Sequence, residues 1–311
     1  MMSYRFGIVI SVACMAFLLA AQGSLSKEKW ITYTTPPAIA VAQVPVAPLL
    51  QFQSGKEVTG LQLTAQAALL IDQQSGSVLF EHNADAPLPP ASTTKLMTAL
   101  VAREVYAPGT LLRVPPLMSI GGTKVGLTPG LQYSVENILE AALISSGNDA
   151  AHTLAANMPG GVDAFVAQMN QKAQEIHLST AAFINPTGFD AVQLRMSARD
   201  LSILTREVLK DSLLKAIVAT PQTVISDISG SRKSILRTTN HLLGVDPRVV
   251  GVKTGTTEEA GQVLVSAFEI DDHVLISIVM GSADRYAETR AIVDWALDAY
   301  EWVEFDQTMV Y

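Results

Sequence analysis

The chain contains the stretch Pro90-Ala91-Ser92-Thr93-Thr94-Lys95-Leu96-Met97-Thr98-Ala99-Leu100, which predicts the start of an apolar helix. Consecutive prolines end any regular structure before it, and good helix formers follow from Thr94. Residues three apart lie over one another on a helix, so the Ser92 hydroxyl and the Lys95 amine are expected to touch. Loss of water around the amine would lower its pKa and let it take the proton from a nucleophilic serine. Taken alone, this spacing is more often a helix cap beside a solvated lysine.

Runs suited to β-strands come before this helix and return near the end of the chain. Residues 61–72 and 78–82 predict an antiparallel hairpin joined by residues 73–77. Later strands are predicted at 223–228, 233–238, 249–254, 262–268 and 273–280, and Asp271-Asp272 is expected to turn the last pair into a hairpin.

Helical periodicity dominates the middle of the chain. It predicts helices at 95–106, 135–144, 150–158, 162–176 and 198–209, with Ser197 capping the last of them. Residues 108–130 are rich in Gly and Pro and predict loops with short strands, and residues 285–301 predict a final helix. The predicted fold class is therefore α/β with mixed layers (α+β), an antiparallel β-sheet built from both ends of the chain with a helical block inserted.

The composition is that of a globular protein with a large core. Of the 311 residues, 49% are hydrophobic and only 16% are charged. The formal net charge of -8 argues against a basic surface for nucleic acid or anionic lipid. No nucleic-acid partner is therefore expected.

The N-terminus has the pattern of an export signal. Arg5 precedes an apolar run that ends in small residues, so we predict a signal peptide, or an uncleaved anchor, at 1–23. Proline-rich residues 24–57 predict a linker, residues 58–302 the folded domain, and residues 303–311 a short tail with no second β domain. The protein is thus expected in the periplasm or at the outer face of the cytoplasmic membrane, with membrane contact only through the N-terminal segment.

Cysteine and histidine usage excludes several chemistries. Cys14 is the single cysteine and lies in the export segment, so neither a disulfide nor a thiol nucleophile is expected in the exported chain. The five histidines, at positions 82, 152, 177, 241 and 273, lack metal-ligand spacing. We therefore expect no metal and no cofactor.

Two further motifs favour a catalytic role for Ser92 and Lys95 over a helix cap. Ser146-Gly147-Asn148-Asp149 lies between two predicted helices, and on its own would be a loop that caps the second one. Gly251-Val252-Lys253-Thr254-Gly255-Thr256-Thr257 is a predicted strand that carries a cation, hydroxyls and a glycine. The ordered set Ser-x-x-Lys, Ser-x-Asn and Lys-Thr-Gly is typical of penicillin-recognising serine enzymes.

With the segments Asn185-Pro186-Thr187-Gly188-Phe189-Asp190 and Ser197-Ala198-Arg199-Asp200-Leu201, these motifs make the chain similar to the serine D-alanyl-D-alanine carboxypeptidases. These are the low-molecular-mass penicillin-binding proteins that trim bacterial peptidoglycan. The resemblance covers about residues 64–300. It implies a β-lactamase-like or penicillin-binding transpeptidase-like fold, a peptidoglycan stem peptide as substrate, and β-lactam antibiotics as covalent inhibitors.

The resemblance also implies a role for each motif residue. Ser92 would attack the carbonyl between the two terminal D-alanines, with Lys95 as its base, and water would resolve the acyl-enzyme. The backbone N–H groups of Ser92 and Thr256 would form the oxyanion hole. Ser146 would relay a proton to the leaving amine, and Asn148 would hold the substrate amide and Lys95. The charge of Lys253 would help to keep Lys95 neutral.

The C-terminal carboxylate of the substrate would lie at the strand that carries Lys253. The resemblance implies that Thr254 and Thr256 bind this carboxylate, that Gly255 leaves room for it, and that Arg285 helps to hold it. A surface arginine in an ion pair is the alternative for position 285.

Three other functions share the fold that the resemblance implies. A D,D-endopeptidase that cuts peptidoglycan cross-links would use the same acyl-serine chemistry. A β-lactamase is disfavoured, because the middle motif is Ser-Gly-Asn and no counterpart of the class A glutamate is evident. A non-catalytic cell-wall binding module would be expected to lack Ser92, Lys95 or Lys253, and all three are present.

Overall fold

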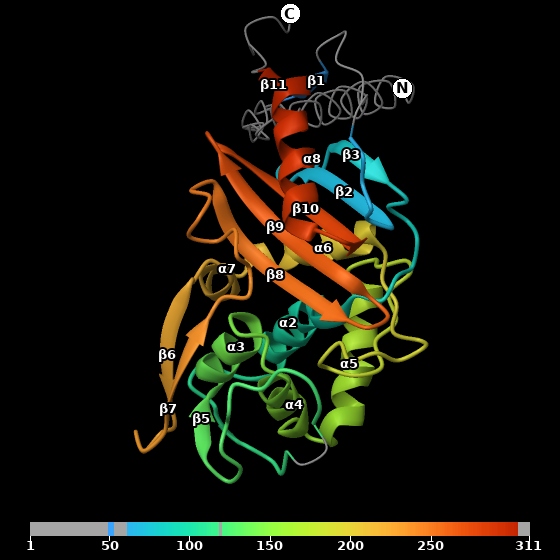
Figure 1. Ribbon diagram of the computed structural model, residues 1–311. Coiled ribbons are helices and arrows are strands. Elements are labelled where there is room, and N and C mark those ends of the chain that lie inside the picture. The colour runs from blue at the N-terminus through green and yellow to red at the C-terminus, as the bar shows by residue number, and fades with distance from the viewer. Residues whose placement is uncertain (1–48, 53–60, 118–119, 304–311) are drawn as a thin grey trace, which may run out of the picture. The chain divides into compact units, whose positions relative to one another are not determined.

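The computed structural model of the protein describes residues 49–52, 61–117 and 120–303 (Figure 1). The predicted export segment and most of the predicted linker and tail lie outside these residues. Among the described helices, none is long and apolar enough to cross a membrane.

The central element is a five-stranded antiparallel sheet with the order β3-β2-β10-β9-β8. Its strands are β2 (Ala67–Asp72), β3 (Val78–His82), β8 (Val249–Thr257), β9 (Gly261–Ile270) and β10 (His273–Ser282). β2 pairs with β10, so strands separated by about two hundred residues lie side by side. The prediction of one sheet built from both ends of the chain is confirmed.

The helical block comes from the middle of the chain, as predicted. It contains the 3-10 turn η1 (Ala91–Thr94) and the helices α2 (Lys95–Val105), α3 (Val135–Leu143), α4 (Asn148–Ala156), α5 (Gly161–Glu175), α6 (Ala198–Lys210) and α7 (Ser212–Val218). Ser197 caps α6 by accepting a hydrogen bond from the backbone N–H of Asp200. The seven-residue helix α7 was not predicted, although Asp211 caps it through two backbone N–H groups.

Both faces of the sheet are covered. Alternate side chains of β2 enter different cores, because successive residues of a strand point to opposite faces. Leu69 packs with the helical block, whereas Leu70 packs with α8 (Arg285–Ala299) through Ile292, Val293 and Ala296. Figure 1 shows α8 across one face of the sheet and α6 behind the other. The molecule is therefore layered as helices, sheet and helix.

Short two-stranded sheets complete the fold. β4 (Leu111–Arg113) pairs with β5 (Gln132–Ser134), and β6 (Gln222–Ser226) pairs with β7 (Lys233–Arg237). The strands predicted at 223–228 and 233–238 are therefore confirmed as a hairpin of their own, apart from the central sheet.

Two predicted boundaries are wrong. The last helix does not continue to residue 301 but ends at Ala299, because β11 (Tyr300–Val303) pairs with β1 (Leu49–Phe52). Residues 61–66 do not extend β2. The Glu288 carboxylate accepts hydrogen bonds from the backbone N–H groups of Thr64 and Ala65, at 2.7 and 3.1 Å, so these groups are held by a side chain.

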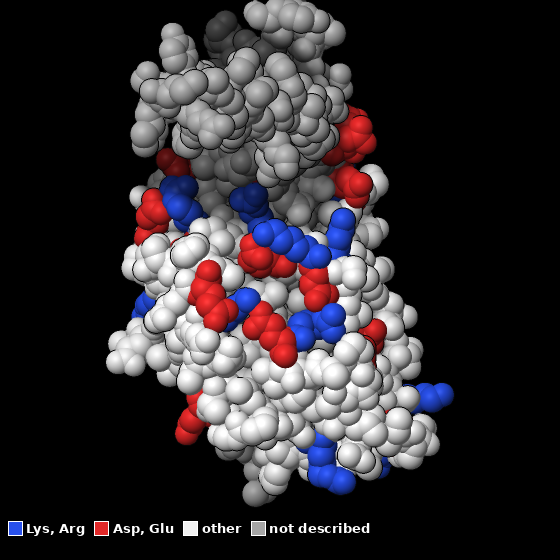
Figure 2. All heavy atoms as spheres, turned by 180° about the vertical axis from the view of Figure 1, so that it is seen from behind, with Lys and Arg blue, Asp and Glu red and all other residues white. Residues whose placement is uncertain are grey.

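Charges of both signs are mixed on the surface. Figure 2 shows acidic and basic side chains interspersed on the face opposite to the view of Figure 1. Arg199, for example, pairs with Glu81 at 2.7 Å and with Asp85 at 2.6 Å. Such exposed pairs contribute little to stability.

Candidate active site

The predicted contact between Ser92 and Lys95 is present. Ser92 lies in η1, directly before α2, and Lys95 is the first residue of α2. The Lys95 Nζ lies 2.9 Å from the Ser92 Oγ and 2.6 Å from the main-chain oxygen of Thr187. The amine therefore has a fixed position beside the hydroxyl.

The surroundings of Lys95 favour a neutral amine. Lys95 is fully buried, and this burial lowers its pKa well below the ordinary lysine value. The nearby charge of Lys253 lowers the pKa further, and the carboxylate of Asp149 opposes the shift. A neutral amine within hydrogen-bond distance of a serine hydroxyl can act as its base.

A second serine and lysine pair lies beside the first. Lys253 on β8 donates from Nζ to Ser146 Oγ and to the main-chain oxygen of Thr254, both at 2.9 Å. Burial and then the charge of Arg285 lower the pKa of Lys253 to about 7. Near neutral pH this amine can therefore both give and accept a proton.

Asn148 and Asp149, at the start of α4, hold the loop of residues 121–127 by hydrogen bonds. Asn148 donates from Nδ2 to the oxygen of Gly121 at 2.8 Å, while its Oδ1 is buried with no hydrogen-bond partner among the described residues. The carboxylate of Asp149 accepts from the consecutive backbone N–H groups of Val125, Gly126 and Leu127. The Asp149 carboxylate thus fixes the loop by hydrogen bonds to its backbone. The Asn148 Oδ1 remains available to a ligand.

The expected hydrogen bond between Asn148 and Lys95 is not present. Within the described part of the chain, Lys95 donates to Ser92 and Thr187 instead. The physical reason is that these two acceptors, Ser92 Oγ and the Thr187 main-chain oxygen, hold the Lys95 amine at 2.9 and 2.6 Å, while Gly121 holds the Asn148 amide.

Gly255 brings β8 against the turn that carries Ser92. A Cβ at position 255 would lie 2.8 Å from the Ala91 Cβ and 3.0 Å from both the Pro90 oxygen and the Ser92 nitrogen. β8 is an edge strand of the sheet, so backbone groups along its free side have no neighbouring strand. A side chain at position 255 would separate these backbone groups from Ser92.

Arg285 lies at the same edge of the sheet. Its Nη1 donates to the Thr256 Oγ1 at 2.8 Å and to the Gly255 oxygen at 2.9 Å, and its guanidinium lies 5.0 Å from the centre of the Tyr286 ring. Thr254 is placed differently, because its hydroxyl shares a 2.6 Å hydrogen bond with the hydroxyl of Thr239. The structure therefore places Arg285 in contact with Thr256. The Thr254 hydroxyl instead contacts Thr239, in the segment between β7 and β8.

The loop from Asn185 to Asp190 supports Lys95, a role that the sequence did not predict. The Asn185 Oδ1 accepts from the backbone N–H groups of Thr187, Gly188 and Phe189. Gly188 has φ +81°, and a Cβ there would lie 1.9 Å from the Ala91 oxygen. The contact to Lys95 comes from the main-chain oxygen of Thr187, which leaves no mark in the sequence.

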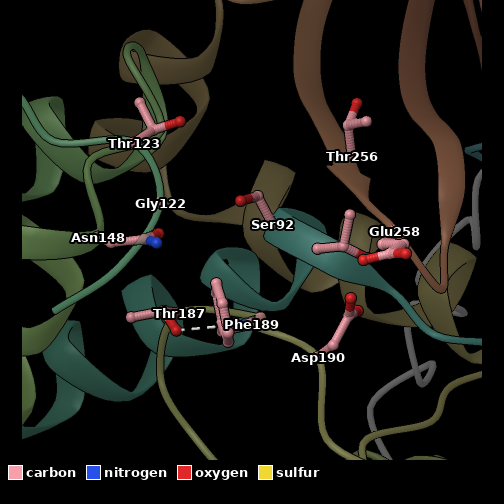
Figure 3. A pocket seen from close by; sticks show the side chains of 11 residues that line it. Ser92, Gly122, Thr123, Asn148, Thr187, Phe189, Asp190, Thr256 and Glu258 are labelled. Atoms are coloured by element: carbon pink, nitrogen blue, oxygen red, sulfur yellow. Dashed lines mark hydrogen bonds between the residues drawn. The ribbon is translucent and has the colours of Figure 1, made fainter.

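A pocket of about 230 Å³ opens at Ser92 (Figure 3). Figure 3 shows the Ser92 hydroxyl between Asn148 on one side and Thr256 on the other. The remaining lining residues are Gly122, Thr123, Thr187, Gly188, Phe189, Asp190, Thr257 and Glu258. A buried amine, a serine hydroxyl and an edge strand around one pocket can support acyl transfer.

A sequence profile matches most of the described chain. The profile of peptidase family S11, described as D-alanyl-D-alanine carboxypeptidase, matches residues 53–284. The D-alanyl-D-alanine carboxypeptidase DacF of Bacillus subtilis is 33% identical over 258 residues, which cover 80% of this chain and 66% of DacF. The D-alanyl-D-alanine endopeptidase of Pseudomonas aeruginosa is 34% identical over 231 residues, which cover 72% of this chain and 74% of that protein. The chain thus spans slightly less than two thirds of the length of DacF.

Solved structures share the fold. A D-alanyl-D-alanine carboxypeptidase from Mycobacterium tuberculosis superposes with a TM-score of 0.73 at 28% identity, over 83% of this chain and 100% of that one. A Streptomyces DD-transpeptidase superposes with a TM-score of 0.73 at 24% identity, over 78% of this chain and 100% of that one. The predicted fold, that of a penicillin-binding transpeptidase, is confirmed.

Proposed function

The chain belongs to peptidase family S11, and from this premise we propose that it is a serine D-alanyl-D-alanine carboxypeptidase. Its substrate would be the pentapeptide stem of peptidoglycan, from which it removes the terminal D-alanine. The observation that carries the proposal is the buried Lys95 amine, 2.9 Å from the Ser92 hydroxyl.

Acylation would begin at Ser92. The Ser92 Oγ attacks the carbonyl carbon of the penultimate D-alanine, and the neutral Lys95 takes the hydroxyl proton. An ester bond forms and the peptide bond breaks. The backbone N–H groups of Ser92 and Thr256 stabilise the negative oxygen, because β8 lies directly against the turn of Ser92.

The leaving D-alanine needs a proton on its amine. Ser146 is placed to deliver it, since its hydroxyl accepts a hydrogen bond from the buried Lys253. The proton that Lys95 took from Ser92 passes to Ser146 and replaces the one given to the amine, so that Lys95 is neutral again. Water then attacks the ester while Lys95 takes a proton from that water, and this proton returns to the Ser92 Oγ as the ester bond breaks and the shortened stem leaves. Each proton that leaves Ser92 is thus restored at the end of the cycle.

Substrate binding would use both sides of the pocket. Thr256 and Arg285 take the C-terminal carboxylate, because their polar groups meet at the edge of β8. Asn148 takes an amide N–H of the stem with its Oδ1, which has no partner among the described residues. Thr254 contributes through its hydroxyl, which Thr239 orients, and Gly255 leaves space for the ligand.

β-Lactam antibiotics would acylate the same serine, and they give a direct test. A fluorescent penicillin should attach covalently to the wild type and not to Ser92→Ala. Lys95→Met should lose most of the labelling while it keeps the fold. Labelling of Ser92→Ala would contradict the mechanism.

A second experiment separates carboxypeptidase from endopeptidase activity. The protein is incubated with equal amounts of a pentapeptide monomer and a D,D-cross-linked dimer, and both are followed by mass spectrometry. Carboxypeptidase activity predicts loss of one D-alanine from the monomer while the dimer persists. Cleavage of the dimer at an equal or higher rate would favour the activity for which the Pseudomonas relative is named.

The place of action would be outside the cytoplasm. The apolar run after Arg5 supports export to the periplasm or to the outer face of the membrane. There the enzyme would limit the pentapeptides available for cross-linking and so influence cell shape.

A further inference from the structure

The guanidinium of Arg285 is held by the protein along one of its sides. Its Nη1 donates to the Thr256 Oγ1, the Gly255 oxygen and the Val263 oxygen, at 2.8, 2.9 and 3.4 Å. Its Nε is buried without a hydrogen-bond partner among the described residues. Each terminal nitrogen of a guanidinium carries two N–H groups, and those of Nη1 are already used. Nη2 is therefore the nitrogen through which Arg285 can bind a carboxylate.

Tyr286, the next residue of α8, contacts this nitrogen. Its hydroxyl oxygen lies 3.4 Å from Arg285 Nη2, and the centre of its ring lies 5.0 Å from the central carbon of the guanidinium. Neither contact is strong alone, because 3.4 Å is long for a hydrogen bond and a cation–π contact contributes little where water has access. Together they restrain rotation of the guanidinium plane, and with it the direction of the second Nη2 hydrogen.

The direction of the Tyr286 hydroxyl is itself determined. The hydroxyl donates to the main-chain oxygen of Thr239 at 2.9 Å, and that oxygen can only accept, so the single hydroxyl hydrogen is used there. The oxygen lone pairs then face two donors, Arg285 Nη2 and the backbone N–H of His241 at 3.3 Å. Toward Arg285 the Tyr286 hydroxyl is therefore an acceptor with a fixed direction.

The segment between β7 and β8 holds Tyr286 in place. The His241 ring stacks on the Tyr286 ring, with 5.3 Å between the centres and 16° between the planes. Thr239 in turn donates from its backbone N–H to the Ile144 oxygen at 3.2 Å, and its hydroxyl bonds the Thr254 hydroxyl at 2.6 Å. The Tyr286 hydroxyl is thus fixed to the same framework as the site.

Resting on the proposed function, we propose that Tyr286 is a positioning residue, whose hydroxyl and ring fix the Arg285 guanidinium so that Nη2 meets the C-terminal carboxylate of the substrate. A guanidinium that is already held loses less conformational entropy when it binds a carboxylate. Tyr286 therefore increases the preference of the enzyme for a free carboxylate over a neutral C-terminus, and it does so without touching the substrate.

Two variants separate the hydroxyl from the ring. Tyr286→Phe removes only the hydroxyl, and Tyr286→Leu removes both contacts. For a peptide that ends in D-alanyl-D-alanine, KM should rise about threefold in the first and about tenfold in the second, with little change in kcat. Tyr300→Phe is the matched control, because it removes a hydroxyl that donates to the main-chain oxygen of Leu79, also at 2.9 Å, and it should keep the wild-type KM.

A variant of Arg285 tests whether Tyr286 acts through it. In Arg285→Ala, the further change Tyr286→Phe should have no effect on KM, because the group that Tyr286 positions is gone. A rise in KM that persists in the Arg285→Ala background would overturn the proposal. So would an unchanged KM in Tyr286→Leu, or a fall in kcat alone, which is the result expected from a purely structural role.

Binding separates failure of this proposal from failure of the proposed function. Calorimetry with Ser92→Ala measures Kd without turnover, for the peptide with a free carboxylate and for the same peptide with a C-terminal amide. Adding Tyr286→Phe should weaken binding of the carboxylate about threefold and leave that of the amide unchanged. An equal loss for both peptides, or no loss for either, would overturn the role of Tyr286. The expected difference in Kd without D-alanine release by the wild type would support that role and count against the carboxypeptidase activity.

Discussion

The Lys95 Nζ lies closer to the Thr187 main-chain oxygen, at 2.6 Å, than to the Ser92 hydroxyl, at 2.9 Å. The Lys95 amine is therefore positioned from two directions, by its own helix and by the loop that begins at Asn185. Thr98 holds the same loop, since its hydroxyl donates to the Pro186 oxygen at 2.6 Å.

Asn185→Ala is expected to disturb Lys95 without touching the substrate. The Asn185 Oδ1 accepts from three backbone N–H groups of the loop, and its loss leaves them without this acceptor. We expect a loss of about 1–3 kcal/mol in the free energy of unfolding and slower acylation by penicillin. Asn185→Asp keeps an acceptor oxygen at this position, so it should retain more of the stability and more of the acylation rate than Asn185→Ala. Unchanged acylation in Asn185→Ala would show that the loop does not position the amine.

Gly255→Ala is expected to separate β8 from Ser92, the proposed nucleophile. The added Cβ would meet three atoms at 2.8–3.0 Å, one of them the Ser92 nitrogen. A displacement of about 1 Å at a reacting group can lower the rate about a hundredfold. Stopped-flow acylation measures this rate. Gly109→Ala is the control, because it adds a methyl group at φ +76° where no atom of the described residues lies within 4 Å, and it should leave acylation unchanged.

Arg285→Ala is expected to weaken recognition of a carboxylate more than that of a neutral group. Arg285 is anchored by Gly255 and Thr256, so its charge has a fixed position at the pocket. KM for a peptide that ends in D-alanine should rise about tenfold or more. The same peptide with a C-terminal amide should bind equally to both proteins. An equal loss for the two peptides would assign Arg285 a structural role alone.

The buried lysine on β8 makes stability depend on pH. Burial, and then Arg285, hold the pKa of Lys253 at about 7, whereas a lysine in an unfolded chain has a pKa of about 10.4. Between these values the unfolded chain binds a proton that the folded chain does not. The free energy of unfolding must therefore fall as the pH falls, by about 2 kcal/mol from pH 9 to pH 7 for this group.

Urea denaturation of the wild type and of Lys253→Met at these two pH values measures that contribution. From pH 9 to pH 7 the free energy of unfolding of the variant should fall by about 2 kcal/mol less than that of the wild type. Parallel losses in both proteins would show that Lys253 is not the group responsible.

The sequence predicted the parts of the site that depend on local geometry. Ser92 and Lys95 are three residues apart on one helix start, so helical spacing alone places them in contact. The contact between Lys253 and Ser146 joins residues 107 positions apart, and only the family resemblance brought these motifs together.

The missed features have no side-chain signature of their own. Thr187 acts through a main-chain oxygen, which any residue would supply. The end of α8 is set by the pairing of Tyr300–Val303 with Leu49–Phe52, at the other end of the described chain, so local periodicity could not reveal it. The strands and helices that were predicted correctly are those whose hydrophobic residues follow a strand or helix period and are buried.

The pairing of β2 with β10 also determines when the central sheet can be completed during synthesis of the chain. The strand that carries Lys253 joins the sheet through β9 and β10, and these are among the last described residues to be made. A nascent chain that ends before residue 282 contains Ser92 and Lys95 but lacks the completed sheet beside them. Long-range pairing of this kind forms late and slowly. Ser92 and Lys95 can therefore be joined by the strand that carries Lys253 only when almost the whole described domain is free to fold.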